Sequence, residues 1–323
     1  MLRMPAPTRG MTREVVIELL WTSAVSIIPN TIAIIGAPNA GKSTLVNALV
    51  GAKVTIVSHK VQTTRTLVRG IAMEGGAQII LVDTPGLFAP RRRLDRAMVT
   101  AAWSGAADAD RVIVLVDAKK GVDEPVEAML EKLGDVRQPK DLVLNKVDLV
   151  ERPKLLDLAT DLNGRARFEK TFMISASTGS GVMDLKRHLA TALPAGPWHY
   201  PEDEISDVPA RMLAAEITRE KLYHRLHDEL PYDATVETES YEERKDGSIR
   251  IEQTIYVVRE GQRKIMLGKG GDSIKRISTA AREELSKLFE TKVHLFLFVK
   301  VRENWGDDPE RYERMGLDYP KGR

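Results

Sequence analysis

Short apolar runs alternate with amphipathic stretches over residues 30–194. The runs are rich in Ile, Val and Leu and are too short for buried helices, which favours strands covered on both faces of a sheet. Strands of this kind are predicted at 31–35, 111–117, 141–146 and 171–175. Helices are predicted between and after them at 42–50, 94–106, 124–136, 153–163 and 182–193. The alternation predicts a doubly wound α/β domain with a mostly parallel sheet.

One pair of runs has no helix between its members. Residues 66–74 and 77–83 flank the turn sequence Glu-Gly-Gly, which is typical of a hairpin. The sheet is therefore expected to contain one antiparallel strand.

The pattern changes after residue 194. A segment rich in proline and acidic residues, 195–209, is interpreted as a linker. Beyond it the order is helix, strand, strand, helix, strand, and the two adjacent strands are joined by the hairpin sequence Arg-Lys-Asp-Gly. These elements are predicted at 211–230, 233–243, 248–258, 272–289 and 292–301. We expect a second domain of α+β type over 210–323.

Residues 1–29 fall outside both predicted domains. Their apolar run, 14–28, contains two glutamates and is too short to cross a bilayer as a helix. We interpret this segment as an N-terminal extension whose role stays open, and a signal or anchor segment is the alternative.

Composition narrows the choice of function only a little. The 323 residues are enough for two domains, and the net charge of +2 means that any site for a polyanion must be local. The chain contains no cysteine, which excludes disulfides and thiolate metal sites and suits a reducing cytosol.

A glycine-rich loop separates the first strand from the first helix. Gly36, Gly41, Lys42 and Ser43 match the phosphate-binding P-loop pattern, in the expected position between strand and helix. Such a loop points several backbone N–H groups at one phosphate chain, and the start of the following helix favours an anion. Lys42 is expected to reach the β- and γ-phosphates, and Ser43 to ligate Mg²⁺.

Two further motifs belong to the same chemistry. Asp-Thr-Pro-Gly at 83–86 ends a buried strand, where Asp83 fits the carboxylate of a Mg²⁺ site and Gly86 can donate its N–H to the γ-phosphate. The polar stretch after the first helix contains Thr63 and Thr64, in the place where a mobile loop supplies a threonine to Mg²⁺. Thr64 is the favoured ligand and Thr63 the alternative.

The base is expected to bind at the ends of the last two strands. In Asn-Lys-Val-Asp, Asp148 can accept two hydrogen bonds that guanine donates and adenine does not, while Asn145 holds the loop and the stem of Lys146 lies along the base. The backbone N–H groups of Ser175 and Ala176 are placed to meet the guanine O6. The order of all these motifs is that of translational-type GTPases.

The motifs together predict a GTP or GDP site with Mg²⁺ as cofactor. The predicted nucleotide contacts are Gly36, Ala37, Pro38, Asn39, Ala40, Gly41, Lys42, Ser43, Thr44, Gln62, Thr63, Thr64, Asp83, Thr84, Pro85, Gly86, Asn145, Lys146, Asp148, Ser175, Ala176 and Ser177. The predicted Mg²⁺ ligands are Ser43, Thr64 and Asp83. Catalytic roles are assigned to Asn39, Lys42, Thr64 and Gly86.

No residue is an obvious choice for orienting the attacking water. Ras-type enzymes use a glutamine just after the glycine of Asp-Thr-Pro-Gly, and that position is Leu87 here. Either hydrolysis is slow and stimulated by a partner, or another group or ion acts. Asn39 has two readings: in a related set of GTPases an asparagine at this place helps to bind K⁺, or it merely tolerates the backbone of the loop.

The second domain contains the loop Gly268-Lys269-Gly270-Gly271 between a strand pair and a helix. This is the context of a KH fold, whose GxxG loop clamps a nucleic-acid backbone. Basic side chains gather around the loop although charges balance over the whole domain, which favours a polyanion site. The predicted RNA contacts are Arg263, Lys264, Gly268, Lys269, Gly270, Gly271, Lys275 and Arg276. A further basic run, 91–93, either contacts RNA or another phosphate-bearing partner, or lies in a solvated loop.

The combination of motifs closely resembles the Era family of GTPases. The resemblance rests on Gln-Thr-Thr-Arg-Thr from residue 62, Asp-Thr-Pro-Gly, the linker sequence Tyr-Pro-Glu-Asp-Glu-Ile-Ser-Asp from residue 200, and Gly-Lys-Gly-Gly-Asp-Ser-Ile-Lys from residue 268. It extends from about residue 31 to about residue 317 and leaves 1–29 unexplained. One departure is Thr66, where members of the family often have histidine.

The resemblance implies a GTPase domain over 30–194, a linker over 195–209 and a type II KH domain over 210–323. It implies slow GTP hydrolysis with Mg²⁺, binding of the 3′ end of 16S rRNA through the KH domain, and a role in 30S ribosomal subunit assembly and rRNA maturation. It also implies a cytoplasmic monomer with some peripheral contact with the inner membrane. Two other classes stay open: an RNA-binding protein in which GTP is structural, and a membrane-associated signalling GTPase.

Overall fold

A six-stranded sheet forms the centre of the first part of the chain. The computed structural model describes residues 30–60, 62–194, 196–226 and 230–320. The strands are β1 (Thr31–Gly36), β2 (Val68–Glu74), β3 (Ala77–Asp83), β4 (Arg111–Asp117), β5 (Lys140–Asn145) and β6 (Lys170–Met173). Their order is β2-β3-β1-β4-β5-β6, and β2 alone among these strands runs antiparallel to its neighbour. The predicted mostly parallel sheet with one antiparallel strand is confirmed.

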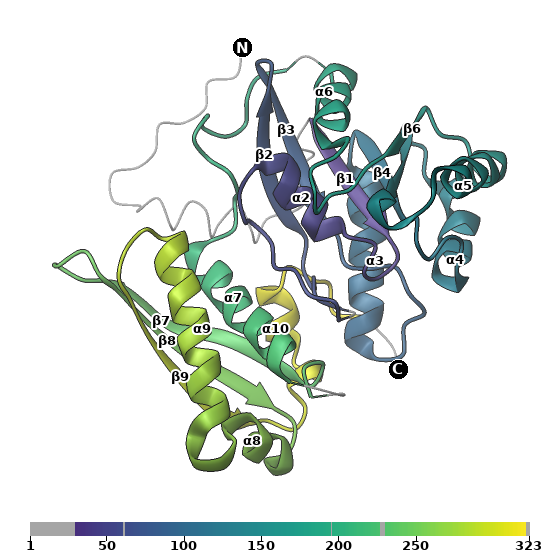
Figure 1. The fold of residues 1–323 in the computed structure, drawn as a ribbon. Helices are drawn as coiled ribbons and strands as arrows, with labels where there is room; N and C mark the ends of the chain where they lie inside the picture. The colour runs from purple at the N-terminus through teal and green to yellow at the C-terminus, as the bar shows by residue number, and fades with distance from the viewer. Residues whose placement is uncertain (1–29, 61, 195, 227–229, 321–323) are drawn as a thin grey trace.

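Helices cover both faces of this sheet (Figure 1). They are α2 (Lys42–Val50), α3 (Arg93–Asp108), α4 (Glu124–Lys132), α5 (Arg152–Arg165) and α6 (Val182–Ala192). Ile32 and Ile34 of β1 pack in the core formed with α2 and α6, whereas Ala33 and Ile35 pack in the core with α3, α4 and α5. Burial on both faces explains the unbroken apolar runs of the sequence. The parallel strands bring the loops after β1, β3, β5 and β6 to one edge, where ligands of such sheets bind.

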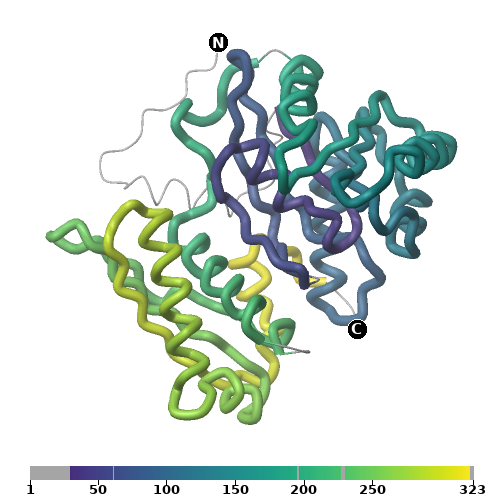
Figure 2. Tube along the Cα trace, viewed as in Figure 1, coloured from purple at the N-terminus to yellow at the C-terminus, as the bar shows by residue number. Residues whose placement is uncertain are grey.

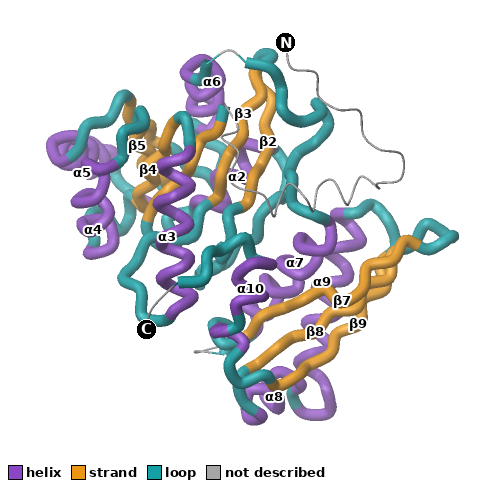
Figure 3. Tube along the Cα trace, turned by 180° about the vertical axis from the view of Figure 1, so that it is seen from behind, coloured by secondary structure: helices purple, strands orange, loops and turns teal. Residues whose placement is uncertain are grey.

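The second part of the chain contains a separate three-stranded sheet. Its strands are β7 (Ala234–Glu243), β8 (Ile249–Val257) and β9 (Val293–Val301), with β7 and β8 antiparallel and β8 and β9 parallel. Helices α7 (Ala210–Arg225) and α9 (Asp272–Leu288) lie side by side on one face of the sheet (Figures 1 and 3). Two apolar clusters join the helices to the strands. The expected α+β architecture is confirmed.

Two helices of this part were not predicted. The residues before Gly268 form α8 (Glu260–Leu267), which lies outside the predicted elements. The Oε1 atom of Gln262 accepts hydrogen bonds from the backbone N–H groups of Val258 and Arg259, which caps the helix, and Met266 anchors it in the core. Helix α10 (Pro309–Arg314) lies beyond the last predicted element, and Asp308 caps it.

The C-terminal segment connects the two parts of the chain. Trp305, Tyr312 and Leu317 form one apolar cluster with Leu94 and Met98 of α3. Viewed from behind, α10 lies between the three-stranded sheet and α3 (Figure 3). The two sheets are therefore held together by a packed interface as well as by the linker.

Arginines of the basic run 91–93 take part in this interface. Arg92 forms an ion pair of 2.7 Å with Asp233, and the guanidinium of Arg93 lies 4.9 Å from the ring centre of Tyr319. Neither interpretation of this run from the sequence foresaw these contacts.

Among the described residues, no helix is both long and apolar enough to cross a membrane. The predicted extension, 1–29, lies outside the described residues.

Candidate functional site

Lys42 is the first residue of α2 and is almost fully buried. Its Nζ donates hydrogen bonds to the carbonyl oxygens of Gly36 at 3.0 Å and Ala37 at 3.1 Å. Burial lowers the pKa of Lys42 to about 8, and the nearby Asp83 carboxylate opposes this change. An ammonium group satisfied only by two carbonyls of its own loop can exchange them for phosphate oxygens, which carry full negative charge.

The residues predicted to bind Mg²⁺ meet around one carboxylate oxygen. Asp83 is fully buried at the end of β3, and its Oδ2 accepts hydrogen bonds from Ser43 Oγ at 2.7 Å and Thr64 Oγ1 at 3.1 Å. The two hydroxyl oxygens lie 2.9 Å apart. Residues from three separate motifs are thus brought into one cluster.

The free oxygen of this cluster fits a hard cation. Asp83 Oδ1 is buried and has no hydrogen-bond partner among the described residues. Burial raises the pKa of Asp83, against the effect of the hydroxyl groups that bond to it and of Lys42. Carboxylate and hydroxyl oxygens are the ligands that Mg²⁺ prefers, so Ser43, Thr64 and Asp83 fit this ion. When bound, Mg²⁺ would neutralise charge on the nucleotide phosphates.

A third hydroxyl, from Thr55, joins this cluster and is not among the predicted site residues. Thr55 Oγ1 donates to Asp83 Oδ2 at 2.8 Å. The side chain of Asn47 holds Thr55 on both sides, because it accepts from the Thr55 N–H at 3.1 Å and donates to the Thr55 carbonyl at 2.8 Å. Nothing in the spacing of motifs distinguishes Thr55 from an ordinary β-branched residue.

Thr55→Val is expected to weaken Mg²⁺ binding by the nucleotide complex about tenfold, because groups that orient a metal-site residue typically contribute 10–100-fold. Valine fills the same space but leaves Asp83 without one of its hydrogen-bond donors. The measurement is a Mg²⁺ titration of the GDP complex, followed by fluorescence of a labelled nucleotide. Thr55→Ser, which keeps the hydroxyl, serves as the control. An unchanged Mg²⁺ affinity in Thr55→Val would exclude this role.

The side chains of the polar stretch before β2 have different hydrogen-bond partners. Thr64 reaches the carboxylate cluster, whereas Thr63 Oγ1 donates to the Lys60 carbonyl at 2.7 Å. The geometry therefore favours Thr64 over Thr63 as the Mg²⁺ ligand. Gln62 Nε2 donates to Asp95 of α3 at 3.0 Å, so this predicted nucleotide contact is engaged elsewhere.

Asn145 ties three loops together at the edge of the sheet. Its Nδ2 donates to the Ala40 carbonyl of the P-loop at 2.8 Å, and its Oδ1 accepts from the Ala176 N–H at 2.9 Å. Lys146 Nζ donates to the Asn39 carbonyl at 2.7 Å. The expectation that Asn145 holds this loop agrees with these contacts.

Lys146 also forms an ion pair with Asp117, a residue that is not among the predicted site residues. Asp117 ends β4, is almost fully buried, and pairs through Oδ2 with Lys146 Nζ at 2.6 Å. Its other oxygen accepts from the Lys119 N–H at 3.0 Å. An acidic residue at the end of a buried strand, here β4, is the same sequence pattern that identifies Asp83 on β3.

The two backbone N–H groups that are predicted to meet the guanine O6 have partners within the protein. The Ser175 N–H donates to the Ser180 carbonyl at 2.9 Å, and the Ala176 N–H donates to Asn145. Both groups are already bonded within the protein, so a contact with O6 requires one of these bonds to be exchanged. Ser177 Oγ lies 3.2 Å from Ser175 Oγ. Asp148, on the short helix η2 (Val147–Leu149), is exposed.

The loop after β3 lies against the P-loop. A Cβ atom on Gly86 would lie 3.0 Å from Pro38 Cγ, and the Leu87 N–H donates to the Gly36 carbonyl at 3.1 Å. Thr84 Oγ1 donates to the Ile34 carbonyl at 2.7 Å and is fully buried. The Thr84 side chain therefore bonds to β1, while Gly86 lies beside the P-loop.

Asn39 has a left-handed backbone, with a φ of 64°, and its Nδ2 donates to the His59 carbonyl at 2.7 Å. The interpretation that Asn39 tolerates the loop backbone agrees with this conformation. Its amide also ties the P-loop to the polar stretch that contains Thr64. A role in K⁺ binding stays a prediction.

The GxxG loop of the second domain projects from the start of α9. Gly268 ends α8, and a Cβ atom there would lie 2.8 Å from Ser273 Cβ, so α9 approaches too closely for a side chain. Gly270 has a φ of 62°, and no atom lies within 4 Å of a Cβ built on it. Lys269 and Lys275 are exposed.

The other basic residues near the loop are partly neutralised. Arg276 forms an ion pair of 2.9 Å with Asp272, and Arg263 forms one of the same length with Glu260. Lys264 is exposed. The lysines rather than the arginines therefore offer the more available charge for a phosphate backbone.

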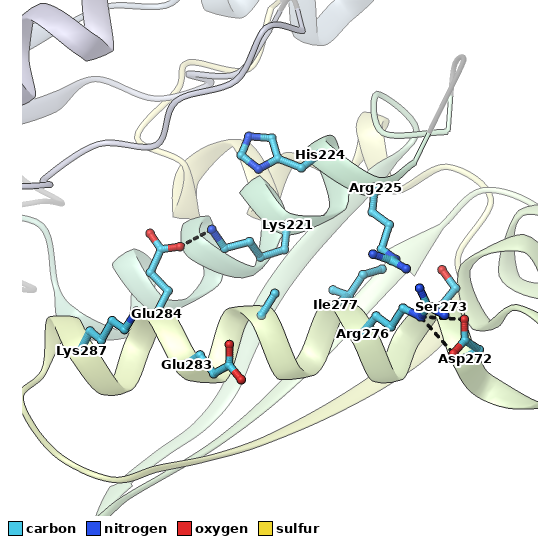
Figure 4. A pocket seen from close by; sticks show the side chains of 11 residues that line it. Lys221, His224, Arg225, Asp272, Ser273, Arg276, Ile277, Glu283, Glu284 and Lys287 are labelled. Atoms are coloured by element: carbon cyan, nitrogen blue, oxygen red, sulfur yellow. Dashed lines mark hydrogen bonds and ion pairs between the residues drawn. The ribbon is translucent and has the colours of Figure 1, made fainter. Parts of the chain in front are cut away.

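A groove of about 940 Å³ lies between α7 and α9 (Figure 4). Lys221 pairs with Glu284 inside it, and Arg276 pairs with Asp272 at its other end. Paired charges of both signs line the groove, so it lacks the basic character that would mark a polyanion site by itself.

Comparisons with known proteins agree with both halves of this description. A family model described as 50S ribosome-binding GTPase matches residues 31–146, and a KH domain model matches residues 229–306. The chain is 66% identical to GTPase Era of Brucella suis over 299 residues, which covers 93% of this chain and 96% of the relative. It is 67% identical to GTPase Era of Rhizobium meliloti over 290 residues, or 90% of this chain and 93% of the relative.

Solved structures show the same arrangement of both domains. A crystal structure of Era in complex with MgGDPNP and nucleotides 1506–1542 of 16S ribosomal RNA is 34% identical, with a TM-score of 0.84 over 89% of this chain and 98% of that one. A single-residue variant of Aquifex aeolicus Era bound to GDP and AlF4⁻ has the same identity and TM-score, over 88% of this chain. The chain belongs to the Era family of GTPases.

Proposed function

We propose that this GTPase hydrolyses GTP slowly, binds the 3′ end of 16S rRNA through its KH domain, and assists 30S ribosomal subunit assembly and rRNA maturation. One observation carries the proposal: the chain combines a cluster around Asp83 that fits Mg²⁺ with an exposed GxxG loop. The two sites lie in different domains, and these domains share a packed interface. The related Era structure that contains MgGDPNP and 16S rRNA nucleotides supports both ligands for this chain.

The proposed division of the chain is a GTPase domain over 30–194, a linker over 195–209 and a KH domain over 210–323. Ser43, Thr64 and Asp83 are the proposed Mg²⁺ ligands, and Asp148 is the proposed guanine contact. Asn39 and K⁺ are proposed as the alternative to a partner that stimulates hydrolysis. Because Leu87 is 4% exposed and apolar, the position of the Ras-type glutamine offers no polar group to a water.

The working partner is proposed to be the 30S subunit in the cytoplasm, with the protein acting as a monomer. Peripheral contact with the inner membrane stays a prediction from the family resemblance.

The direct test of the proposed function is binding of a labelled RNA that ends in the 16S rRNA 3′ sequence. We expect binding to be tighter than for a scrambled RNA of equal length and to differ between GTP-analogue and GDP complexes. Equal affinity for both RNAs would contradict the proposal.

Lys269→Glu is expected to weaken binding of that RNA at least tenfold, since it replaces an exposed positive charge on the GxxG loop with a negative one beside the phosphate backbone. Filter binding at fixed salt measures the effect. Lys245→Glu, an equal charge change at an exposed position of the β7–β8 hairpin loop, is the matched control. Equal losses in the two variants would mean that overall charge, and not the loop, binds the RNA. GDP affinity should stay unchanged in both.

A further inference from the structure

The polar stretch that contains Thr64, the proposed Mg²⁺ ligand, is bonded to the second domain. It runs from α2 to β2 beside α7 (Figures 1 and 2). The Tyr223 hydroxyl of α7 donates to the Gln62 carbonyl at 3.2 Å, and the Arg219 guanidinium donates to the Thr63 carbonyl. The backbone immediately before Thr64 is therefore bonded to α7.

The residue after Thr64 is anchored more strongly still. Arg65 is only 3% exposed. Its guanidinium donates to the Ala234 carbonyl at 3.0 Å and the Tyr223 hydroxyl at 3.1 Å, and it lies 5.5 Å from the ring centre of Trp305. Further bonds reach the carbonyls of Pro231 and Tyr232. A buried guanidinium needs several acceptors, and here both terminal nitrogens have them, whereas Nε has no hydrogen-bond partner among the described residues. The acceptors of the second domain thus form a socket for Arg65.

Thr64 itself faces the other way. Its hydroxyl lies 2.9 Å from Ser43 Oγ and 3.1 Å from Asp83 Oδ2, inside the cluster that fits Mg²⁺. The chain thus alternates between domains over three residues: Thr63 is bonded to α7, Thr64 to the GTPase domain and Arg65 to the KH domain. The bonds on both sides thus hold Thr64 beside the cluster.

We propose that Arg65 is a positioning residue for Thr64, and that the KH domain, through the socket around Arg65, completes the Mg²⁺ site of the GTPase domain. The proposal rests on the proposed role of Thr64 in Mg²⁺ binding. The simpler alternative is that Arg65 only joins the domains. Other contacts already do so, for example the ion pairs of Lys53 with Glu220 and of Arg92 with Asp233, both at 2.7 Å.

A positioning role and a purely structural role of Arg65 predict different changes in the affinities for GTP and GDP. A switch threonine contributes to Mg²⁺ only when the γ-phosphate is present. Loss of positioning should therefore weaken binding of a non-hydrolysable GTP analogue and spare GDP. Loss of a purely structural contact should weaken both nucleotides together or neither.

The experiment measures the affinities of the full-length protein for Mg²⁺–GTP analogue and Mg²⁺–GDP by fluorescence titration. Arg65→Ala is expected to weaken analogue binding at least tenfold and GDP binding less than twofold. Tyr223→Phe keeps the packing and removes one hydroxyl, and about a fivefold selective loss is expected. If Arg65→Ala does not fold, as judged by thermal unfolding, Tyr223→Phe decides alone. Arg69→Ala is the matched control, because it breaks a contact with the linker that does not reach Thr64.

The outcomes separate this inference from the proposed function. Equal losses for both nucleotides, or no loss for the analogue, would overturn the role of Arg65. Thr64→Ala tests the site on which it rests. If Thr64→Ala leaves analogue affinity unchanged, the proposed Mg²⁺ ligand is wrong, and the positioning of that residue by Arg65 falls with it.

Discussion

Gly41→Ala is expected to lower the affinity for GDP and GTP at least 100-fold, which corresponds to about 3 kcal/mol. Gly41 precedes α2 with a φ of 100°, where an alanine costs about 1–2 kcal/mol in backbone strain. A Cβ atom there would also lie 2.3 Å from Asn145 Nδ2. Since Asn145 ties the P-loop to the guanine loops, the methyl group disturbs phosphate and base binding together. Isothermal titration with each nucleotide measures the effect.

Gly51→Ala provides a control that isolates the clash. Gly51 ends α2 with a φ of 84°, and no atom lies within 4 Å of a Cβ built there. This variant should lose about 1 kcal/mol of folding stability through strain and keep its nucleotide affinity. Similar losses of affinity in both variants would show that a strained helix end, and not contact with Asn145, controls binding.

The residues that could be predicted are those whose type is set by the ligand. A phosphate chain requires glycines, a lysine and a hydroxyl at fixed spacing, so Gly41, Lys42 and Ser43 are visible in the sequence without a structure. Asp83 is visible because an acidic residue at the end of a buried strand needs a positive partner. The alternation of apolar runs likewise predicted the sheet, since strands covered on both faces have no polar face.

The residues that could not be predicted serve protein neighbours far away in the sequence. Thr55 meets Asp83 because Asn47 holds the backbone of Thr55, and Asp117 meets Lys146 because β4 and β5 are adjacent. No local pattern encodes either approach. Helix α8 was missed because glycine and basic residues around the GxxG loop resemble a loop, while its cap depends on one side chain, Gln262.

The interface between the domains was outside the reach of pattern analysis for the same reason. Arg65 looks like one exposed basic residue in a polar stretch, but its socket is assembled from α7, the start of β7 and Trp305. A folded second domain is needed to bring these groups together. The motifs of the sequence therefore indicate the two domains, and the structure adds the contacts that join them.

Asp148→Asn is expected to change the preferred base from guanine to xanthine. The Asp148 carboxylate can accept from both N1–H and the exocyclic amino group of guanine, and each hydrogen bond to a charged group contributes about 1.5–3 kcal/mol. Asparagine loses one acceptor and presents an N–H donor to the amino group, so GDP affinity should fall at least 100-fold. Xanthine has a carbonyl oxygen in place of that amino group, which pairs with the new donor. Titration with GDP and xanthosine diphosphate measures both changes.

Because Asp148 is exposed, this test separates base recognition from folding stability. On η2 the side chain lies at the protein surface, so its replacement leaves no buried group unpaired and should not change folding stability. Asp157→Asn, the same charge change on the exposed side of α5, should keep the preference for GDP. If Asp148→Asn loses GDP without gaining xanthosine diphosphate, Asp148 supports the loop and does not read the base. Guanine specificity would then rest on the backbone after β6, where the Ala176 N–H would have to exchange Asn145 for the guanine O6.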